Sequence, residues 1–158
     1  MISRRVLVLV VLLGLVFVAA SVGSVFTSRS VSDWYEDLAK PSWTLPGWVF
    51  GPVWTVLYVL MAAAAWLVWL QEGLTRGRVP LALFAAQLVL NAAWSGLFFG
   101  LHMPGLALAE LVVLLAAIAA TTVAFWRASP TAGAMMLPYL GWVTFAAALN
   151  LAIWRMNA

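Results

Sequence analysis

The 158-residue sequence contains no cysteine, a single histidine and few charged residues. The absence of cysteine excludes disulfide frameworks, thiolate metal sites and cysteine nucleophiles. One histidine and five acidic residues leave too few ligands for an ordinary metal centre, so we expect none. Charged residues make up 8% of the chain, against about 25% in soluble globular domains. A soluble fold is therefore nearly excluded.

The basic residues also lack the density that nucleic acid binding requires. The chain has eight Lys and Arg and a net charge of +3, but they are scattered over short polar segments. No cluster could follow a phosphate backbone, so we expect no nucleic acid partner. In a membrane protein such residues set the topology instead.

What the chain has in abundance is hydrophobic residues, which make up 66% of it. A membrane-spanning helix needs about 20 apolar residues, and the uncharged stretches between charges mark where such helices lie. The stretches lack the strict alternation of a β-barrel. We therefore expect an all-α membrane protein, a five-transmembrane-helix bundle that forms one domain over residues 1–158. The predicted helices are about 6–27, 48–70, 80–101, 105–126 and 131–154, with a long loop at 28–47.

The first predicted helix could also be a signal peptide, because a basic start precedes it and small residues follow at 18–21. Its unbroken apolar run is longer than a typical signal sequence, which favours a retained helix that contacts the lipid bilayer. Five basic residues on the amino-terminal side against three on the other predict a cytoplasmic amino terminus. The sequence is rich in Arg and poor in Lys, which suggests a bacterial cell membrane. The five basic residues on the amino-terminal side are Arg4, Arg5, Arg76, Arg78 and Arg127. The three on the other side are Arg29, Lys40 and Arg155.

Ten tryptophans are many for a chain of this length. Seven of them fall near predicted helix ends, where indoles commonly anchor a protein at the bilayer interface. The remaining three, Trp54, Trp94 and Trp142, lie well inside predicted helices. Interfacial anchoring therefore does not explain them.

The helix predicted at 80–101 has two specialised faces when its residues are plotted at 100° each. One face is aromatic and polar: Phe84, Gln87, Asn91, Trp94 and Phe98. The opposite face is mostly small: Ala82, Ala86, Val89, Ala93, Gly96 and Gly100. Small residues allow close approach of another helix, either in a homodimer or within the same chain. The amides cannot face hydrocarbon, so the first face is expected to point into the bundle.

Two further helices carry faces that match it. They are Trp54, Tyr58, Met61 and Ala65 on one helix, and Tyr139, Trp142, Ala146 and Asn150 on the other. Together these faces predict a slot walled by aromatic rings, with a few amides for hydrogen bonds. Such a slot suits a flat, largely apolar ligand. Alternatively, the aromatic rings fill the core and the amides bond across helices.

Few residues are candidates for catalysis or ion coupling. Glu110 is the one ionisable residue well inside a predicted span, and its carboxylate could reach the interface or have a pairing or gating role. No Ser, His and Asp share a face, so the sequence gives little support for an enzyme. Arg29 and Lys40, at the mouth of the slot, could meet ligand carboxylates or be solvated.

The first loop and the helix after it carry a dense motif. It reads Trp34-Tyr35-x-x-Leu38-x-Lys40-Pro41-Ser42-Trp43-x-x-Pro46-x-Trp48-Val49-Phe50-Gly51-Pro52-x-Trp54-x-x-Leu57-Tyr58. Later segments are Gln87-Leu88-x-Leu90-Asn91-x-x-Trp94, Pro138-Tyr139-Leu140-x-Trp142 and Leu149-Asn150-x-x-x-Trp154-Arg155. This combination resembles the TspO/MBR family of tryptophan-rich sensory and translocator proteins, over essentially the whole chain.

The resemblance implies a five-helix bundle, often a homodimer, with a ligand cavity beneath the first loop. It implies no obligatory cofactor, but protoporphyrin IX or haem as ligand. Ala82 and Ala86 match the family's dimer contact. The sterol-recognition pattern of animal members departs here at Leu151, so we expect no sterol binding. Matching ligand-pocket positions are Tyr35, Trp54, Asn91, Trp94, Trp142 and Ala146, with Tyr58 on the same wall.

The resemblance leaves three functions to compare. The first is a membrane sensor or regulator that binds tetrapyrroles and acts in porphyrin or stress responses. The second is a light-dependent porphyrin-degrading enzyme, in which Trp142 would be the catalytic residue. The third is a transporter of porphyrins or small apolar ligands, which the shortage of buried charge disfavours.

Overall fold

The computed structural model describes residues 3–158, and this part of the chain is helical with no strands. Met1 and Ile2, which begin the predicted domain, lie outside the described residues. Short elements flank the long helices: α2 at Trp34–Asp37, a 3₁₀ turn at Gly47–Val49 and a π-helical turn at Gly96–Gly100. The long helices are α1 at Arg4–Ser30, α3 at Phe50–Ser95, α4 at Pro104–Ala128 and α5 at Pro130–Asn157.

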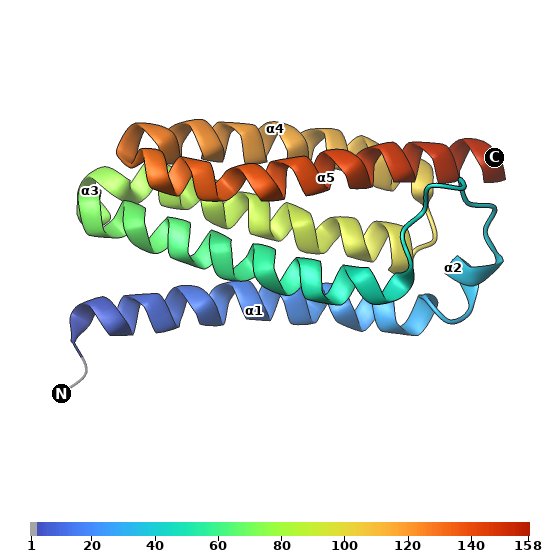
Figure 1. Ribbon diagram of the computed structural model, residues 1–158, viewed down its shortest axis with the longest axis horizontal. Helices are drawn as coiled ribbons and strands as arrows, with labels where there is room; N and C mark the ends of the chain where they lie inside the picture. The colour runs from blue at the N-terminus through green and yellow to red at the C-terminus, as the bar shows by residue number, and fades with distance from the viewer. Residues whose placement is uncertain (1–2) are drawn as a thin grey trace.

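Helix α3 doubles back on itself at Gly73 (Figure 1). Gly73 has φ 64° and ψ −164°, a backbone conformation that only glycine adopts readily. The two arms then run side by side, as hydrogen bonds from Tyr58 to Asn91 and from Gln87 to Met61 show. The chain therefore passes along the bundle five times, which confirms the all-α bundle expected from the sequence.

The reversal is tighter than the sequence predicted. The polar segment 71–79 was expected to form a turn between two helices, but it is helical on both sides of Gly73. One glycine reverses the chain, and the nearby charges Glu72, Arg76 and Arg78 sit on helical turns instead of in a loop. Helix α1 extends to Ser30 and the 3₁₀ turn begins at Gly47, so the long loop shrinks to residues 31–46, which include α2. Helix α5 also extends beyond its predicted ends.

Within residues 3–158, four helical segments are long and apolar enough to cross a membrane, and one of them is the α3 hairpin, which supplies two passes. The outer surface of α1 exposes apolar side chains such as Val10, Val11 and Val18, as a lipid-facing helix does. The chain is therefore a multi-pass membrane protein.

Helices α4 and α5 pack closely together and both pack on α3, while α1 lies along the far side of α3 (Figure 1). The core includes Phe125 and Ile118 of α4, Tyr139 of α5 and Met61 of α3, all fully buried. One end of the bundle carries residues 31–46, α2 and the carboxyl end of α5, and we call it the loop end.

Candidate functional site

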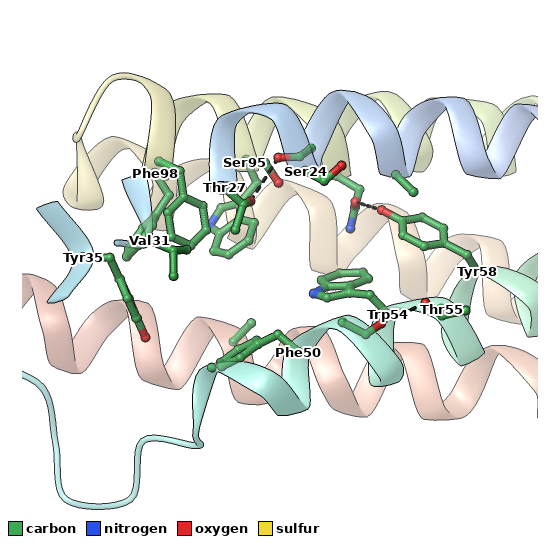
Figure 2. Close-up of a pocket in the computed structure, with 18 of the residues that line it drawn as sticks. Ser24, Thr27, Val31, Tyr35, Phe50, Trp54, Thr55, Tyr58, Ser95 and Phe98 are labelled. Atoms are coloured by element: carbon green, nitrogen blue, oxygen red, sulfur yellow. Dashed lines mark hydrogen bonds between the residues drawn. The ribbon is translucent and has the colours of Figure 1, made fainter. Parts of the chain in front are cut away.

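A cavity of about 460 Å³ lies between α1, both arms of α3 and α5, near α2 at the loop end (Figure 2). This volume falls within the usual range for small-molecule sites, about 300–1,000 Å³. Its aromatic lining consists of Phe17, Tyr35, Phe50, Trp54, Tyr58, Trp94, Phe98 and Phe99. Its polar lining consists of Ser21, Ser24, Thr27, Thr55, Asn91, Ser95 and Asn150. Neither set includes a charged side chain, so the cavity is neutral and largely apolar.

The structure brings most of the predicted ligand-binding residues to this cavity. Trp54 and Tyr58 come from the first arm of α3, and Asn91 and Trp94 from the second. Ala146 comes from α5, and Tyr35 comes from α2 at the cavity mouth. Figure 2 shows Trp54 and Tyr58 facing the cavity from the arm opposite α1. Residues separated by more than 100 positions in the sequence therefore line one cavity.

Trp142, by contrast, is absent from the cavity lining. Its ring packs edge-on against Trp54, with centroids 6.5 Å apart, and against Phe50 at 5.7 Å. It borders a shallow apolar groove between α3 and α5 instead. The α5 residues that do line the cavity begin one turn further along the helix, at Ala146. The Trp142 ring therefore lies against the Trp54 ring and outside the lining of this cavity, unlike its predicted place in the slot.

A directional hydrogen-bond network joins the cavity to the bundle core. The Tyr58 hydroxyl donates to Asn91 Oδ1 at 2.8 Å, and Asn91 Nδ2 donates to the Tyr139 hydroxyl at 3.1 Å. The Tyr139 hydroxyl in turn donates to Gln87 Oε1 at 2.8 Å. The amides therefore do bond across helices, yet Asn91 keeps a second N–H, and Tyr58 keeps acceptor capacity, beside the cavity. Structural and ligand-binding roles are compatible in the same residues.

Trp94 is fixed in a similar way. Its indole Nε1 donates to Asn150 Oδ1 at 3.1 Å, and Asn150 Nδ2 donates to the Pro104 carbonyl at 2.8 Å. The Trp94 ring stacks on Phe98 with centroids 5.5 Å apart. Because its polar N–H is satisfied within the protein, Trp94 presents an apolar ring to the cavity.

Helix α1 contributes hydroxyl groups that the sequence reading missed. The side chains of Ser21, Ser24 and Thr27 line the cavity, and each donates to a carbonyl of its own helix. Their oxygens can still accept a hydrogen bond from a ligand. The regular spacing of these residues, three apart, could have indicated that they share one face of the helix. The rest of the helix is largely apolar, which is typical of a simple membrane-spanning segment.

Lys40 holds the loop together at the cavity mouth. Its Nζ donates to the carbonyls of Tyr35, Glu36 and Leu38 at 2.7, 2.9 and 3.0 Å, and lies 4.9 Å from the centre of the Tyr35 ring. These three bonds use all the ammonium protons, so Lys40 serves the loop instead of a ligand carboxylate. Burial raises the pKa of the Tyr35 phenol above its ordinary value, so this group stays protonated at neutral pH.

Two more contacts tie the loop to the bundle. Asn157, at the end of α5, accepts from the Ala39 N–H at 3.0 Å and donates to the Ala39 carbonyl at 2.9 Å. Trp34 stacks on His102 with centroids 4.2 Å apart, and His102 Nε2 lies 3.2 Å from Ser30 Oγ. The loop is therefore anchored at the carboxyl end of α5 and at the turn before α4.

Asn157→Ala is expected to loosen the loop without unfolding the bundle. Two hydrogen bonds are lost, each with a net contribution of about 1 kcal/mol, so the loop should open roughly thirtyfold more often. Hydrogen–deuterium exchange of residues 31–46 measures this opening. Met156→Ala is the matched control because Met156 is exposed beside Asn157. Equal exchange in Asn157→Ala and Met156→Ala would contradict the anchoring role.

The small-residue face of α3 is divided between two environments. Gly96 and Gly100 face the Phe26 ring of α1, so this part packs within the chain. Ala82 and Ala86, the residues predicted to contact a second subunit, are exposed on the outer surface of the second arm. Their contact in a homodimer remains a prediction. Within residues 3–158, no group of three His, Asp or Glu side chains is placed to hold a metal ion.

The fold and the cavity define a class: an all-helical, multi-pass membrane protein with an aromatic-walled internal cavity at one end. The sequence profile of the TspO/MBR family matches residues 10–155, and the chain belongs to that family, as its motifs predicted. It is 45% identical to the Translocator protein of Homo sapiens over 138 residues, which cover 86% of this chain and 82% of that protein. It is 40% identical to the Tryptophan-rich protein TspO of Chlorobaculum tepidum over 157 residues, 98% and 99% of the two chains. It is 39% identical to Protein CrtK of Rhodobacter capsulatus over 143 residues, 88% and 86% of the two chains.

Proposed function

We propose that this protein binds a tetrapyrrole, protoporphyrin IX or haem, in the cavity and acts as a sensor or regulator of porphyrin or stress responses. We place it in a bacterial cell membrane, with the amino terminus in the cytoplasm and the loop end outside. The observation that carries the proposal is the cavity itself. Flat rings from α2 and from both arms of α3 surround a neutral space that has only a few hydrogen-bonding groups.

The chemistry of the lining indicates how a macrocycle would lie. Trp54, Trp94 and Phe98 offer ring faces and edges for stacking, and the free N–H of Asn91 can meet a polar edge of the ligand. The lining of the described cavity has no cation, so the propionate groups would point to the open mouth and remain in water. Aromatic packing, not ion pairing, would then supply most of the affinity.

The lining also bears on the role of iron. Among the described residues that line the cavity there is no His, Cys or Met; of its two tyrosines, Tyr58 donates its hydroxyl proton to Asn91 and Tyr35 stays a protonated phenol. These are the side chains that usually ligate haem iron. The proposed site therefore binds the macrocycle through contacts with its ring and not through a bond to iron. Metal-free protoporphyrin should then bind about as tightly as haem.

Trp54→Ala is expected to weaken protoporphyrin binding about tenfold. The substitution removes one stacking wall, and a loss of about 1.4 kcal/mol corresponds to a tenfold change in Kd. Titration in detergent or nanodiscs, followed by tryptophan quenching and by porphyrin absorbance, measures the affinity. Trp126→Ala is the control, since Trp126 is half exposed at the end of α4 and does not line the cavity.

Two outcomes of this titration would overturn the proposal. One is the lack of saturable binding by the unaltered protein. The other is equal affinity in Trp54→Ala and Trp126→Ala, which would move the ligand out of the cavity. A loss confined to Trp54→Ala is the result expected.

Light-dependent degradation and transport are the alternative functions. Degradation at Trp142 has one observation in its favour, the edge-on contact between Trp142 and Trp54, although the ligand itself would touch Trp54. Bleaching of bound porphyrin under light, compared with porphyrin on albumin, tests this alternative. Ligand flux across proteoliposomes tests transport.

A further inference from the structure

Glu110 differs from every other charged residue of the chain in its position within the bundle. It lies six residues into α4, about 9 Å along the helix axis from Pro104. Among the described residues, the other acidic and basic side chains lie near helix ends, in the segments that connect helices, or on the helical turns beside the Gly73 reversal. The sequence left open whether the Glu110 carboxylate reaches the interface or has a pairing or gating role.

The structure places the carboxylate away from both water and a partner. The Glu110 side chain as a whole is partly exposed, on a helix that faces lipid, but both carboxylate oxygens are shielded. Neither oxygen has a hydrogen-bond partner among the described residues. An ionised carboxylate without a partner is very unfavourable in such surroundings, and a bound proton removes the charge.

No described basic side chain bonds to the Glu110 carboxylate in place of that proton. At the same end of the bundle, His102 contacts Ser30 and Trp34, and Arg155 of α5 is exposed. Ala107, one turn before Glu110 on α4, packs in one buried cluster with Leu149 and Ile153 of α5, which line the cavity. Tyr139 of α5 interacts with Glu110 electrostatically, without a hydrogen bond between them. The Tyr139 hydroxyl accepts a hydrogen bond from Asn91, and Asn91 accepts one from the hydroxyl of Tyr58 of α3. The basic residues of α3, Arg76 and Arg78, lie near Gly73 at the opposite end of the bundle. The titratable neighbours in the interior are therefore phenols.

We propose that Glu110 is a proton-binding site within the membrane, linked to the cavity through Tyr139, Asn91 and Tyr58. In the empty protein the side chain is a carboxylic acid. A ligand that bonds to Asn91 or Tyr58 changes the surroundings of Tyr139, and so the free energy of the proton on Glu110. Linkage makes this effect reciprocal, so the protonation of Glu110 also alters ligand affinity. This second part rests on the proposed tetrapyrrole function, whereas the proton site itself does not.

Infrared spectroscopy of the ligand-free protein tests the proton site directly. At about pH 6, where water-exposed glutamates are ionised, we expect a carboxylic acid C=O band that shifts in D₂O. The band should disappear in Glu110→Gln and move in Glu110→Asp, which keeps a carboxyl group. Glu36→Gln is the control, because Glu36 is exposed in α2. If no band depends on residue 110, the carboxylate is ionised and the proposal is wrong.

Addition of saturating protoporphyrin tests the link to the cavity. An anionic ligand nearby favours the neutral acid, so the Glu110 band should shift or grow in the unaltered protein and not in Glu110→Gln. A band present without ligand but unchanged by bound porphyrin would overturn the link. Failure of porphyrin to bind at all would appear separately, in the titration of Trp54→Ala and Trp126→Ala, and would count against the proposed function. Helix content by circular dichroism shows whether each variant is folded.

Discussion

Gly133→Val is expected to destabilise the bundle by about 3 kcal/mol, whereas Gly141→Val should change its stability by less than about 1 kcal/mol. A Cβ atom at Gly133 would lie 2.7 Å from the Trp126 Cα atom, which belongs to the backbone of α4. A Cβ atom at Gly141 would meet nothing within 4 Å. Overpacking in a tight core commonly costs about 1–3 kcal/mol, and a branched side chain against backbone belongs at the upper end.

The backbone around Gly133 cannot relieve this clash easily. Helix α4 ends at Ala128 and α5 begins at Pro130, so a single residue, Ser129, joins them. The Ser129 hydroxyl also caps α5 by accepting from the Ala132 N–H at 3.4 Å. The first turn of α5 is thus held against the last turn of α4.

Thermal unfolding in detergent, followed by circular dichroism, compares the two glycine variants. Both substitutions replace a helical glycine of α5 by valine, so differences in helix propensity cancel between them. The expected result is a clearly lower midpoint for Gly133→Val alone. Equal midpoints would mean that α4 and α5 can separate at their junction without loss of stability.

The sequence predicted the inward face of the second α3 arm well. Phe84, Gln87, Asn91 and Phe98 are buried, and Trp94 is partly buried beside the cavity. This success has a simple reason. Amide groups and hydrocarbon are incompatible, so the position of two amides fixes which side of a membrane helix faces the protein.

Other features carried no comparable signal. The hydroxyls of α1 bond to their own helix, which any Ser or Thr in a membrane helix can do, so their presence alone did not indicate a cavity wall. The Gly73 reversal and a longer polar turn place the same charges near the same interface, so charge patterning cannot distinguish them.

Long-range contacts to the backbone were also beyond prediction. The Asn157 side chain bonds to the backbone of Ala39, 118 residues away, and backbone groups are the same at every position. Lys40 likewise bonds to carbonyls, where the sequence suggested a ligand carboxylate or solvent. The contacts of Asn157 and Lys40 that shape the cavity mouth could therefore be identified only from the structure.

Asn91→Leu is expected to lower the free energy of unfolding by about 2 kcal/mol and to weaken protoporphyrin binding. The leucine removes the acceptor of the buried Tyr58 hydroxyl and one donor to Tyr139, and leaving such groups unsatisfied costs about 1–3 kcal/mol. It also removes the N–H that Asn91 offers to a ligand. Thr55→Val is the control, because Thr55 lines the same cavity but bonds to its own helix at Gly51.

Combining Asn91→Leu with Tyr58→Phe separates a hydrogen bond from simple loss of packing. When both partners of a buried hydrogen bond are replaced by apolar groups, no group is left unsatisfied, so the double variant should be more stable than the sum of the single effects predicts. We expect a coupling of about 1 kcal/mol between residues 58 and 91, measured by the unfolding of all four proteins. Additive effects would mean that Tyr58 and Asn91 contribute independently. Coupling in stability, together with a binding defect that persists in the double variant, would assign both a structural and a ligand-binding role to Asn91.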